Sequence, residues 1–115
     1  MHEVSLMQQA VGIAVDHAER NGCSRVLAVK MRVGDLSGVV PDALDLAFAV
    51  SSRGTIVEGA ELQIETVAVE CVCEPCGGRF EPPRDCAVYR CPICNTTTAK
   101  VVRGREFAVA SIEVD

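Results

Sequence analysis

Aromatic side chains are scarce in this 115-residue chain, which has no Trp, one Tyr and three Phe. So few rings leave little surface on which nucleic-acid bases could stack. The chain also lacks a basic excess, because 11 Lys and Arg stand against 16 Asp and Glu, a net charge of −5. Nucleic-acid binders usually carry a basic face. These two deficits argue against nucleic acid as the partner.

Long apolar runs are absent as well. No stretch approaches the ~20 residues of a membrane span. The first ten residues, MHEVSLMQQA, show no basic segment followed by an apolar one, as a secretory signal would. We therefore expect a soluble, cytoplasmic protein with no membrane partner. The length predicts one small domain with room for a compact inserted module.

Cysteine is the residue present in excess. Seven occur in the chain, and six of them fall between Cys71 and Cys94. A secreted disulfide scaffold would spread its cysteines and usually contain an even number of them. The clustering, the odd count and the missing signal together favour metal binding.

Apolar periodicity predicts two helices. Residues 3–20 form the first, ended by Asn21-Gly22, and its apolar stripe consists of Val4, Met7, Val11, Ala14 and Ala18. Pro41 opens the second, Gly54 ends it, and its core stripe is Leu44, Ala47 and Phe48.

Alternating apolar residues predict strands over residues 25–33, 61–69 and 105–114. In the first strand we expect one face to carry Leu27, Val29, Met31 and Val33. Residues 71–103 lose this periodicity and are dominated by cysteine, proline and glycine. Because strands flank this segment, we interpret it as an insertion that protrudes from a helix-and-strand core.

Two CxxC units within the insertion carry the strongest signal. They are CEPC (residues 73–76) and CPIC (residues 91–94), with fourteen residues between them. Two residues between thiolates let one tight turn aim both sulfurs at one ion, and small residues after the second Cys let backbone N–H groups point at the sulfurs. We therefore predict one tetrahedral site. Its ligands are Cys73, Cys76, Cys91 and Cys94.

Zinc is the expected occupant, because it accepts four thiolates without redox chemistry and a closed site is structural. Iron is the alternative, since CPIC also resembles a rubredoxin knuckle. Such iron sites are packed with aromatics, and this module offers only Phe80 and Tyr89. Cys71 and Cys86 are interpreted as spectators, although Cys71 could exchange into the metal site, and Cys23 as a small structural residue.

The N-terminus is a second candidate metal site. The α-amine of Met1, the amide nitrogen of His2 and the His2 imidazole can close adjacent chelate rings on one ion. Loss of the amide proton favours square-planar geometry, which suits Ni(II) or Cu(II). The amide or carboxylate of Glu3 can supply a fourth donor. Taken alone, a His at position 2 is more often a frayed terminal residue, and His17 reads as an ordinary helix side chain.

Several segments occur in an order that resembles the HypA/HybF family of hydrogenase maturation proteins, which act as nickel metallochaperones. The resemblance covers the whole chain. It rests on MHEVSLMQQ at the start, LSGVVP after the first strand, ELQIE, the two CxxC units and the closing SIEV. Only the CxxC units are specific alone, but the set is jointly specific.

The resemblance implies an α+β fold in which two helices lie on a small three-stranded sheet, with an inserted zinc-ribbon-like module. The nickel-binding domain would comprise residues 1–69 plus 104–115, and the zinc-binding domain residues 70–103. Nickel would be held by Met1, His2 and Glu3, and zinc by the four CxxC cysteines. Expected partners are the maturation GTPase of the hydrogenase pathway and the hydrogenase large subunit; urease maturation and a homodimer are left open.

The sequence favours a binding and transfer protein and not an enzyme. It has no glycine-rich phosphate loop and no nucleophile–base pair with local spacing. The alternative is a zinc-ribbon module that binds nucleic acid or protein. That alternative predicts basic residues around the CxxC units, where Arg and acidic residues are instead balanced.

Overall fold

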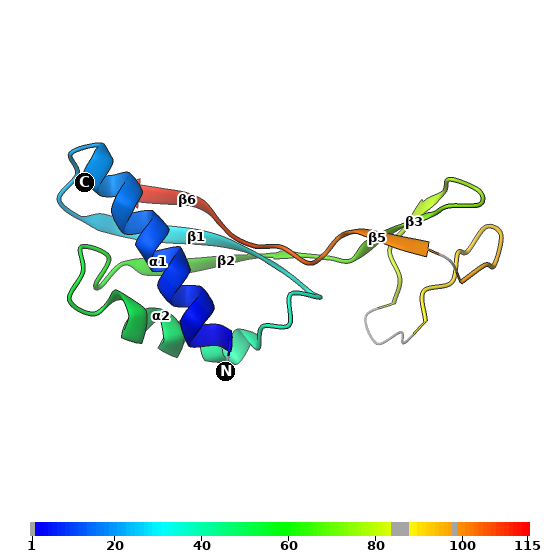
Figure 1. The fold of residues 1–115 in the computed structure, drawn as a ribbon, viewed down its shortest axis with the longest axis horizontal. Helices are drawn as coiled ribbons and strands as arrows, with labels where there is room; N and C mark the ends of the chain where they lie inside the picture. Colours follow the sequence, from blue (N-terminus) through cyan, green and yellow to red (C-terminus); the bar gives the residue numbers. More distant parts are fainter. Residues whose placement is uncertain (1, 84–87, 98) are drawn as a thin grey trace.

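The computed structural model describes residues 2–83, 88–97 and 99–115. Two small sheets lie end to end in an elongated molecule of 54 × 27 × 17 Å, with both helices beside the first sheet (Figure 1). The elements in chain order are α1 (His2–Arg20), β1 (Val26–Gly34), the 3₁₀ turn η1 (Pro41–Ala43), α2 (Leu44–Ser52), β2 (Glu61–Val67), β3 (Glu70–Cys73), β4 (Arg79–Phe80), β5 (Ala99–Arg103) and β6 (Phe107–Val114).

Helix α1 forms and ends as its sequence predicts. Four members of its apolar stripe are buried in the core: Met7, Val11, Ala14 and Ala18. The fifth, Val4, is partly buried against it. After Arg20, the N–H of Gly22 donates to the Glu19 carbonyl (3.1 Å) and the N–H of Cys23 to the Ala18 carbonyl (2.9 Å). This pair of bonds is a Schellman motif, which requires the positive φ of 72° that Gly22 adopts.

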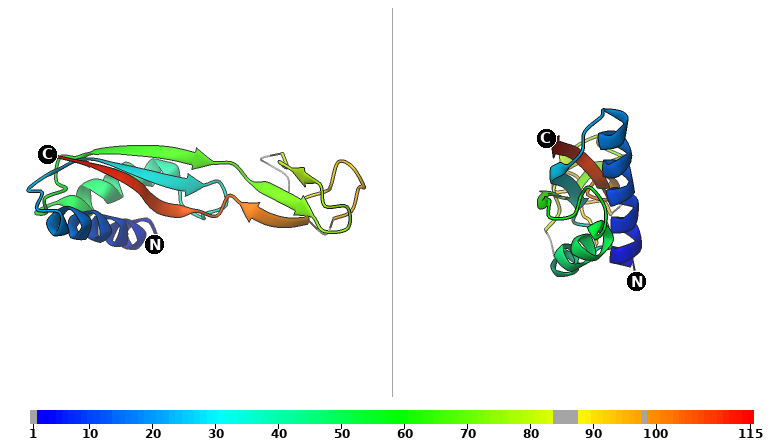
Figure 2. Two further views of the ribbon diagram at one scale, coloured as in Figure 1. Left: turned by 90° about the horizontal axis from the view of Figure 1, so that it is seen from above. Right: turned by 90° about the vertical axis from the view of Figure 1, so that its left-hand side faces the viewer.

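Strand β1 lies at the centre of the first sheet, between β2 and β6. It pairs in parallel with β2, from Ala28↔Glu61 to Gly34↔Val67, and antiparallel with β6. Parallel neighbours need a crossover connection, which η1 and α2 supply. Both helices therefore cover the same face of the sheet and leave the other face open (Figure 2). The predicted α2 stripe of Leu44, Ala47 and Phe48 is buried in this layer.

Strand β1 does not keep the predicted alternation. Leu27 was expected on the buried face but is 43% exposed, whereas its neighbours Val26 and Ala28 are buried. The β1–β6 register shifts between Val26 and Ala28. A bulge that inserts one residue moves the following side chains to the other face, so Leu27 points outward while Val29, Met31 and Val33 point into the core.

The second predicted strand ends two residues earlier than expected. Residues 61–69 were expected to form one strand, but β2 ends at Val67 and the chain enters β3 of the other sheet at Glu70. In the second sheet β3 lies between β4 and β5, both antiparallel to it. The second helix likewise starts later than expected, because η1 occupies Pro41–Ala43 before α2 begins.

Two segments connect the sheets: Ala68–Val69 between β2 and β3, and Gly104–Glu106 between β5 and β6. Together with Gly34–Leu36 we call them the neck. The Asp35 N–H donates to the Val67 carbonyl (2.9 Å), and the Leu36 N–H to the Gly104 carbonyl (2.6 Å). Backbone approach is so close that a Cβ on Gly34 would lie 2.2 Å from the Gly104 oxygen. The neck therefore depends on glycine at this position.

Glu106 stabilises the neck through its carboxylate. Its Oε1 accepts the Gly104 N–H at 2.8 Å. Hydrogen bonds from its own N–H and then from the Gly104 N–H hold the pKa of Glu106 below the ordinary value of 4.5. A carboxylate with a lowered pKa stabilises the folded state above its ordinary pKa, and that contribution is lost as pH falls through the folded value.

We therefore expect the hydrogen-exchange protection factor of the Gly104 amide to fall as pH is lowered below about 4.5. The Glu106→Gln variant should show reduced protection that does not change over this range, since it has no carboxyl group to titrate. Exchange measured by NMR at several pH values checks this. Unchanged wild-type protection across the titration would show that Glu106 does not stabilise the neck.

Substitution of Met31 tests the core between the helices and the first sheet. Its side chain is fully buried, so Met31→Ala should lower the free energy of unfolding by about 2–5 kcal/mol. Leu46 is the matched control: it is 71% exposed on α2, and Leu46→Ala should stay within about 0.5 kcal/mol of wild type. Urea unfolding followed by helical circular dichroism measures both. Equal losses in the two variants would contradict this assignment of the core.

No helix in the described part of the chain is long and apolar enough to cross a membrane.

Candidate metal centres

The four cysteines of the CxxC units converge at the end of the second sheet. Cys73 closes β3 and Cys76 follows in the next turn, while Cys91 and Cys94 lie in the loop before β5. Their sulfur atoms all lie within 4.8 Å of one another. The structure thus brings together all four residues that the spacing selected.

The sulfur positions fit a tetrahedral ion. The Sγ atoms of Cys73 and Cys94 are 3.3 Å apart, and those of Cys76 and Cys91 are 3.6 Å apart. Four sulfurs at about 2.3 Å from one zinc ion would lie about 3.8 Å from each other. Only small movements would therefore place one ion among the four sulfurs.

Both CxxC turns have the same backbone design. In the first, the Gly77 N–H donates to the Cys73 carbonyl (2.6 Å). In the second, the Asn95 N–H donates to the Cys91 carbonyl (2.9 Å). Gly77 and Asn95 adopt positive φ values of 75° and 66°, which Gly and Asn tolerate better than other residues. This equivalence explains why Gly and Asn directly follow the second cysteine of each unit.

Hydrogen-bond donors surround the sulfurs. The Ile93 N–H donates to Cys91 Sγ at 3.4 Å. The Thr96 hydroxyl lies 3.3 Å from Cys73 Sγ and 3.5 Å from Cys94 Sγ. Such donors stabilise thiolates and orient metal ligands. Thr96 was not among the predicted site residues. Its only signal in the sequence is its position two residues after Cys94, the last cysteine of the second CxxC unit.

The thiols differ in acidity for identifiable reasons. The Thr96 hydroxyl, followed by the Thr96 N–H, lowers the pKa of Cys94 to about 6. The N–H of Cys94, followed by that of Ile93, lowers the pKa of Cys91. The Gly78 N–H also lowers the pKa of Cys76, but hydrogen bonding to the Cys73 thiol and burial outweigh it and raise the value to about 12. Four adjacent thiols cannot all ionise without a cation, because like charges repel.

The other cysteines occupy different positions. Cys71 is fully buried on β3, paired with Phe80 and Val101, and its sulfur is not one of the four that cluster. Burial raises the pKa of its thiol, which makes it a poor nucleophile. Cys23 packs half-buried against the core of the first sheet. Cys86 lies outside the described residues.

The predicted nickel segment lies at the start of α1, next to η1 (Figure 1). Met1 lies outside the described residues, and His2 is the first residue of α1. Glu3 is only 8% exposed. Its Oε2 accepts the Val40 N–H at 3.2 Å, which ties the first turn of α1 to the loop before η1. The structure does not bring this segment near the four cysteines, which lie at the end of the other sheet (Figure 1).

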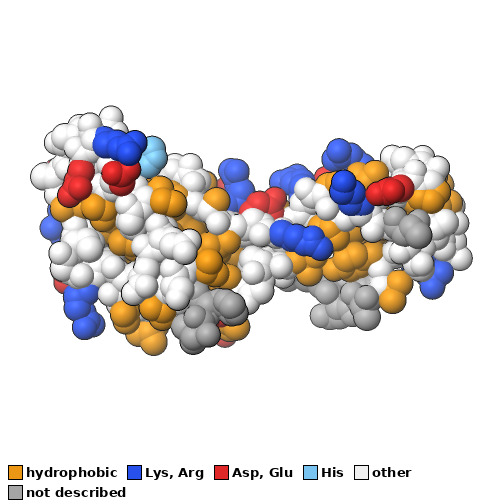
Figure 3. Space-filling model, viewed as in Figure 1, with side chains coloured by type: hydrophobic (Ala, Val, Ile, Leu, Met, Phe, Trp, Pro, Cys, Tyr) orange, Lys and Arg blue, Asp and Glu red, His pale blue; other side chains and the backbone are white. Residues whose placement is uncertain are grey.

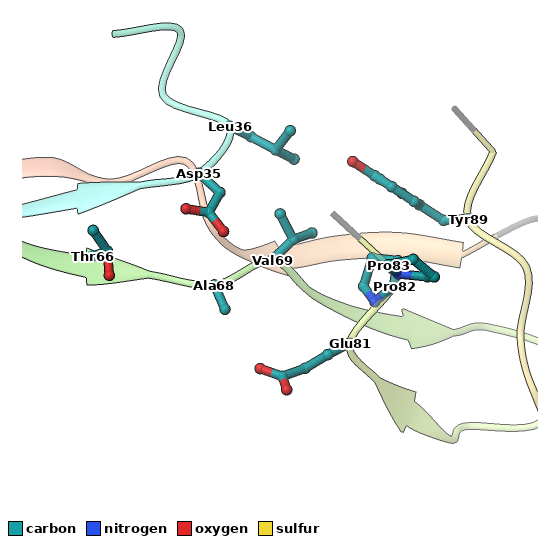
Figure 4. A pocket seen from close by; sticks show the side chains of 9 residues that line it. All are labelled: Asp35, Leu36, Thr66, Ala68, Val69, Glu81, Pro82, Pro83 and Tyr89. Atoms are coloured by element: carbon teal, nitrogen blue, oxygen red, sulfur yellow. The ribbon is translucent and has the colours of Figure 1, made fainter. Parts of the chain in front are cut away.

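The hollow where the two sheets meet was not anticipated. It has a volume of about 670 Å³ and is lined by Thr66 of β2 and by residues of the neck and the inserted module. Figure 4 shows the Ala68–Val69 segment between the side chains of Asp35 and Glu81, while the Tyr89 hydroxyl points towards Leu36. The two carboxylates do not converge on one point, so the described residues that line the hollow offer no paired acid and base.

A two-helix α+β layer that carries a four-thiol zinc-ribbon-like module defines a small metal-binding protein. A family profile described as "Hydrogenase/urease nickel incorporation, metallochaperone, hypA" matches residues 1–114. The chain therefore belongs to the HypA family of nickel metallochaperones, as the resemblance predicted.

Individual relatives agree with this assignment. The hydrogenase maturation factor HypA of Picosynechococcus sp. is 42% identical over 114 residues, which is 99% of each chain. That of Geobacter metallireducens is 41% identical and matches over the full length of both chains. The fold is shared with the solution structure of the Ni metallochaperone HypA from Helicobacter pylori (24% identity, TM-score 0.71, 97% of this chain and 96% of that one).

Proposed function

We propose that this chain binds Ni(II) through its first three residues and delivers it during maturation of a [NiFe]-hydrogenase. The donors are the amine of Met1, the amide and imidazole of His2, and the amide or carboxylate of Glu3. Membership of a nickel-incorporation family supports this proposal most directly. The first N–H groups of a helix have no carbonyl partner within the helix, so binding of a metal at the His2 amide would break no hydrogen bond of α1.

The contact between Glu3 and Val40 supports a fixed position for this segment. The buried carboxylate anchors the first turn of α1 to the loop before η1. Every nickel donor must lose its proton, so nickel affinity falls with acid. Protonation of the His2 imidazole would then remove one donor and give a route to release.

We propose zinc as the resident ion of the four-cysteine cluster. The donor set, the sulfur spacing and the surrounding N–H and hydroxyl donors fit a closed, structural zinc site. Bound there, zinc would hold Cys73, Cys76, Cys91 and Cys94 as thiolates and so fix the two turns. With all four positions occupied by protein, the ion has no open site for catalysis.

The two sheets then correspond to two functional parts: residues 1–69 plus 104–115 for nickel, and residues 70–103 for zinc. We propose a carrier and not an enzyme, with the maturation GTPase and the hydrogenase large subunit as partners and urease maturation as a second route. Reduced cysteines suit a reducing compartment such as the cytoplasm.

A titration with Ni(II) tests the N-terminal site. Untagged wild-type protein should take up one equivalent of Ni(II) with its zinc unchanged. His2→Ala, and a version with Gly-Ser added before Met1, should lose this uptake because each removes donors from the chelate. The matched control is His17→Ala, because His17 is an exposed histidine of the same helix. Calorimetry with metal analysis of the isolated complexes provides the readout.

The controls separate this proposal from nonspecific nickel binding. His17→Ala should bind like wild type. Equal uptake by all four proteins would end the proposal, and nickel uptake accompanied by zinc loss would move the nickel site to the thiols.

A further inference from the structure

Unpaired cations gather at one edge of the inserted module. Strand β5 is an outer strand of the second sheet, and among the described strands it pairs with β3 alone. Lys100 and Arg103 on β5, and Arg105 just after it, are exposed. None of the three forms an ion pair with a described residue, whereas four of the other cations do: Arg20, Lys30, Arg32 and Arg79.

This edge contrasts with the rest of the chain. Residues 1–69 and 104–115 contain twelve acidic and six basic residues, whereas residues 70–103 contain four acidic and five basic ones. The acidic groups near β5 are already engaged. Glu70 pairs with Arg79 at 3.0 Å, and Glu106 accepts the Gly104 N–H. The positive charge of the edge is therefore available to a partner even though the whole chain is acidic.

The edge is hollowed and has apolar side chains at its centre. A depression of about 320 Å³ is lined by Val101, Val102, Arg103, Arg105 and Glu106. The β3–β5 register shifts so that Val102 is an extra residue between the pairs Cys71↔Val101 and Glu70↔Arg103, and its side chain is 41% exposed. On this module Figure 3 shows apolar side chains with Lys and Arg beside them.

We propose that the β5 edge docks an extended, acidic segment of a partner protein, with Asp or Glu alternating with aliphatic residues. Arg103 and Arg105 supply guanidinium groups that bind carboxylates through two parallel hydrogen bonds. The valines provide an apolar floor for the aliphatic residues. An outer strand presents a row of backbone N–H and C=O groups to which a further strand can add.

The same features disfavour nucleic acid. Base stacking needs aromatic rings, and the segment 70–103 has only Phe80 and Tyr89. A duplex or single strand would also meet the repulsion of a chain with a net charge of −5. A short acidic peptide can contact the edge alone and avoid most of that repulsion.

Docking here would leave the nickel segment free, because β5 belongs to the second sheet and the start of α1 lies beside the first (Figure 1). A partner could then be held while the ion is transferred elsewhere on the molecule. The docking site itself stands on the residues of β5 and does not depend on where nickel binds.

Peptide titration on the full-length, zinc-loaded protein tests the proposal. The probe is the acetylated, amidated peptide Glu-Val-Asp-Val-Glu-Val-Asp, added at low salt to ¹⁵N-labelled protein. Amide shifts should be confined to residues 99–106 and should diminish as NaCl is added. The Lys100→Gln, Arg103→Gln, Arg105→Gln triple variant should bind at least tenfold more weakly. The control variant removes three arginines outside the inserted module, Arg20 at the end of α1, Arg25 just before β1 and Arg53 just after α2, and should bind like wild type.

Three results would overturn the proposal. The first is an absence of peptide binding, or shifts centred on other residues. The second is an equal loss in the control variant, which would mean that net charge alone governs binding. The third is a partner of another class. A fluorescein-labelled twelve-nucleotide oligo-dT that binds more tightly than the peptide would show nucleic-acid binding. A dimer in light scattering that the β5 triple variant abolishes, with no peptide-induced shifts in β5, would show self-association.

Discussion

Replacing Cys91 with alanine should release zinc and unfold the inserted module while leaving the helices folded. Cys91 is almost fully buried, and its sulfur is one of the four that cluster. Structural zinc contributes ~10–16 kcal/mol of apparent folding free energy, and three thiolates leave the site open. The module has little core of its own to compensate, because Val88 and Ile93 are 53% and 74% exposed.

Zinc analysis together with a ¹H–¹⁵N spectrum would show this outcome. Signals from residues 70–103 should collapse to the shift range of unfolded peptides, whereas those of α1 and α2 should persist, since their core is formed by the first sheet. Cys23→Ala is the matched control: it removes a thiol outside the cluster and should retain one zinc. A Cys91→Ala protein that kept stoichiometric zinc and a folded module would refute the four-thiolate site.

Substituting alanine for Gly34 should destabilise the fold more than the same change at any other glycine of the chain. The new Cβ would lie 2.2 Å from the Gly104 oxygen and 2.3 Å from the Gly104 carbon. These are backbone atoms, which cannot rotate away as a side chain can. We expect a loss of about 4 kcal/mol or more, in the exceptional range for point mutations, because β1 and the neck must separate to admit the methyl group.

Gly12 provides the control for the glycine substitution. It lies in the middle of α1 with no atom within 4 Å of the position of a Cβ. Gly12→Ala should therefore raise stability by roughly 0.5–1 kcal/mol, since alanine favours the helix. Chemical unfolding of both variants measures the two changes. A Gly34→Ala protein within about 1 kcal/mol of wild type would contradict the packing of the neck.

Local patterns in the sequence were sufficient to predict the helices and the cysteine cluster. The α1 stripe follows from residue spacing and its end from Asn21-Gly22, because both depend on interactions within a few residues. The four thiols were predicted because each CxxC unit is itself a local turn. Only their shared ion requires the two turns to meet.

Features that depend on distant parts of the chain were not predictable in this way. The exposure of Leu27 arises from its register with β6, at the far end of the sequence. The end of β2 at Val67 depends on the neck, where Gly104 approaches Gly34. The contact of Glu3 with Val40 joins the chain start to a loop that no periodicity describes. Each was settled by a tertiary contact that overrides local preference.

X-ray absorption at the nickel edge gives the most direct test of whether nickel binds at the N-terminal segment and not at the four-cysteine cluster. Untagged, zinc-loaded protein would receive one equivalent of Ni(II), and the Ni K-edge spectrum would identify the ligand atoms. If the first three residues bind Ni(II), only nitrogen and oxygen donors will surround nickel, in a square-planar arrangement. Sulfur neighbours around nickel, together with zinc released into the buffer, would contradict this assignment.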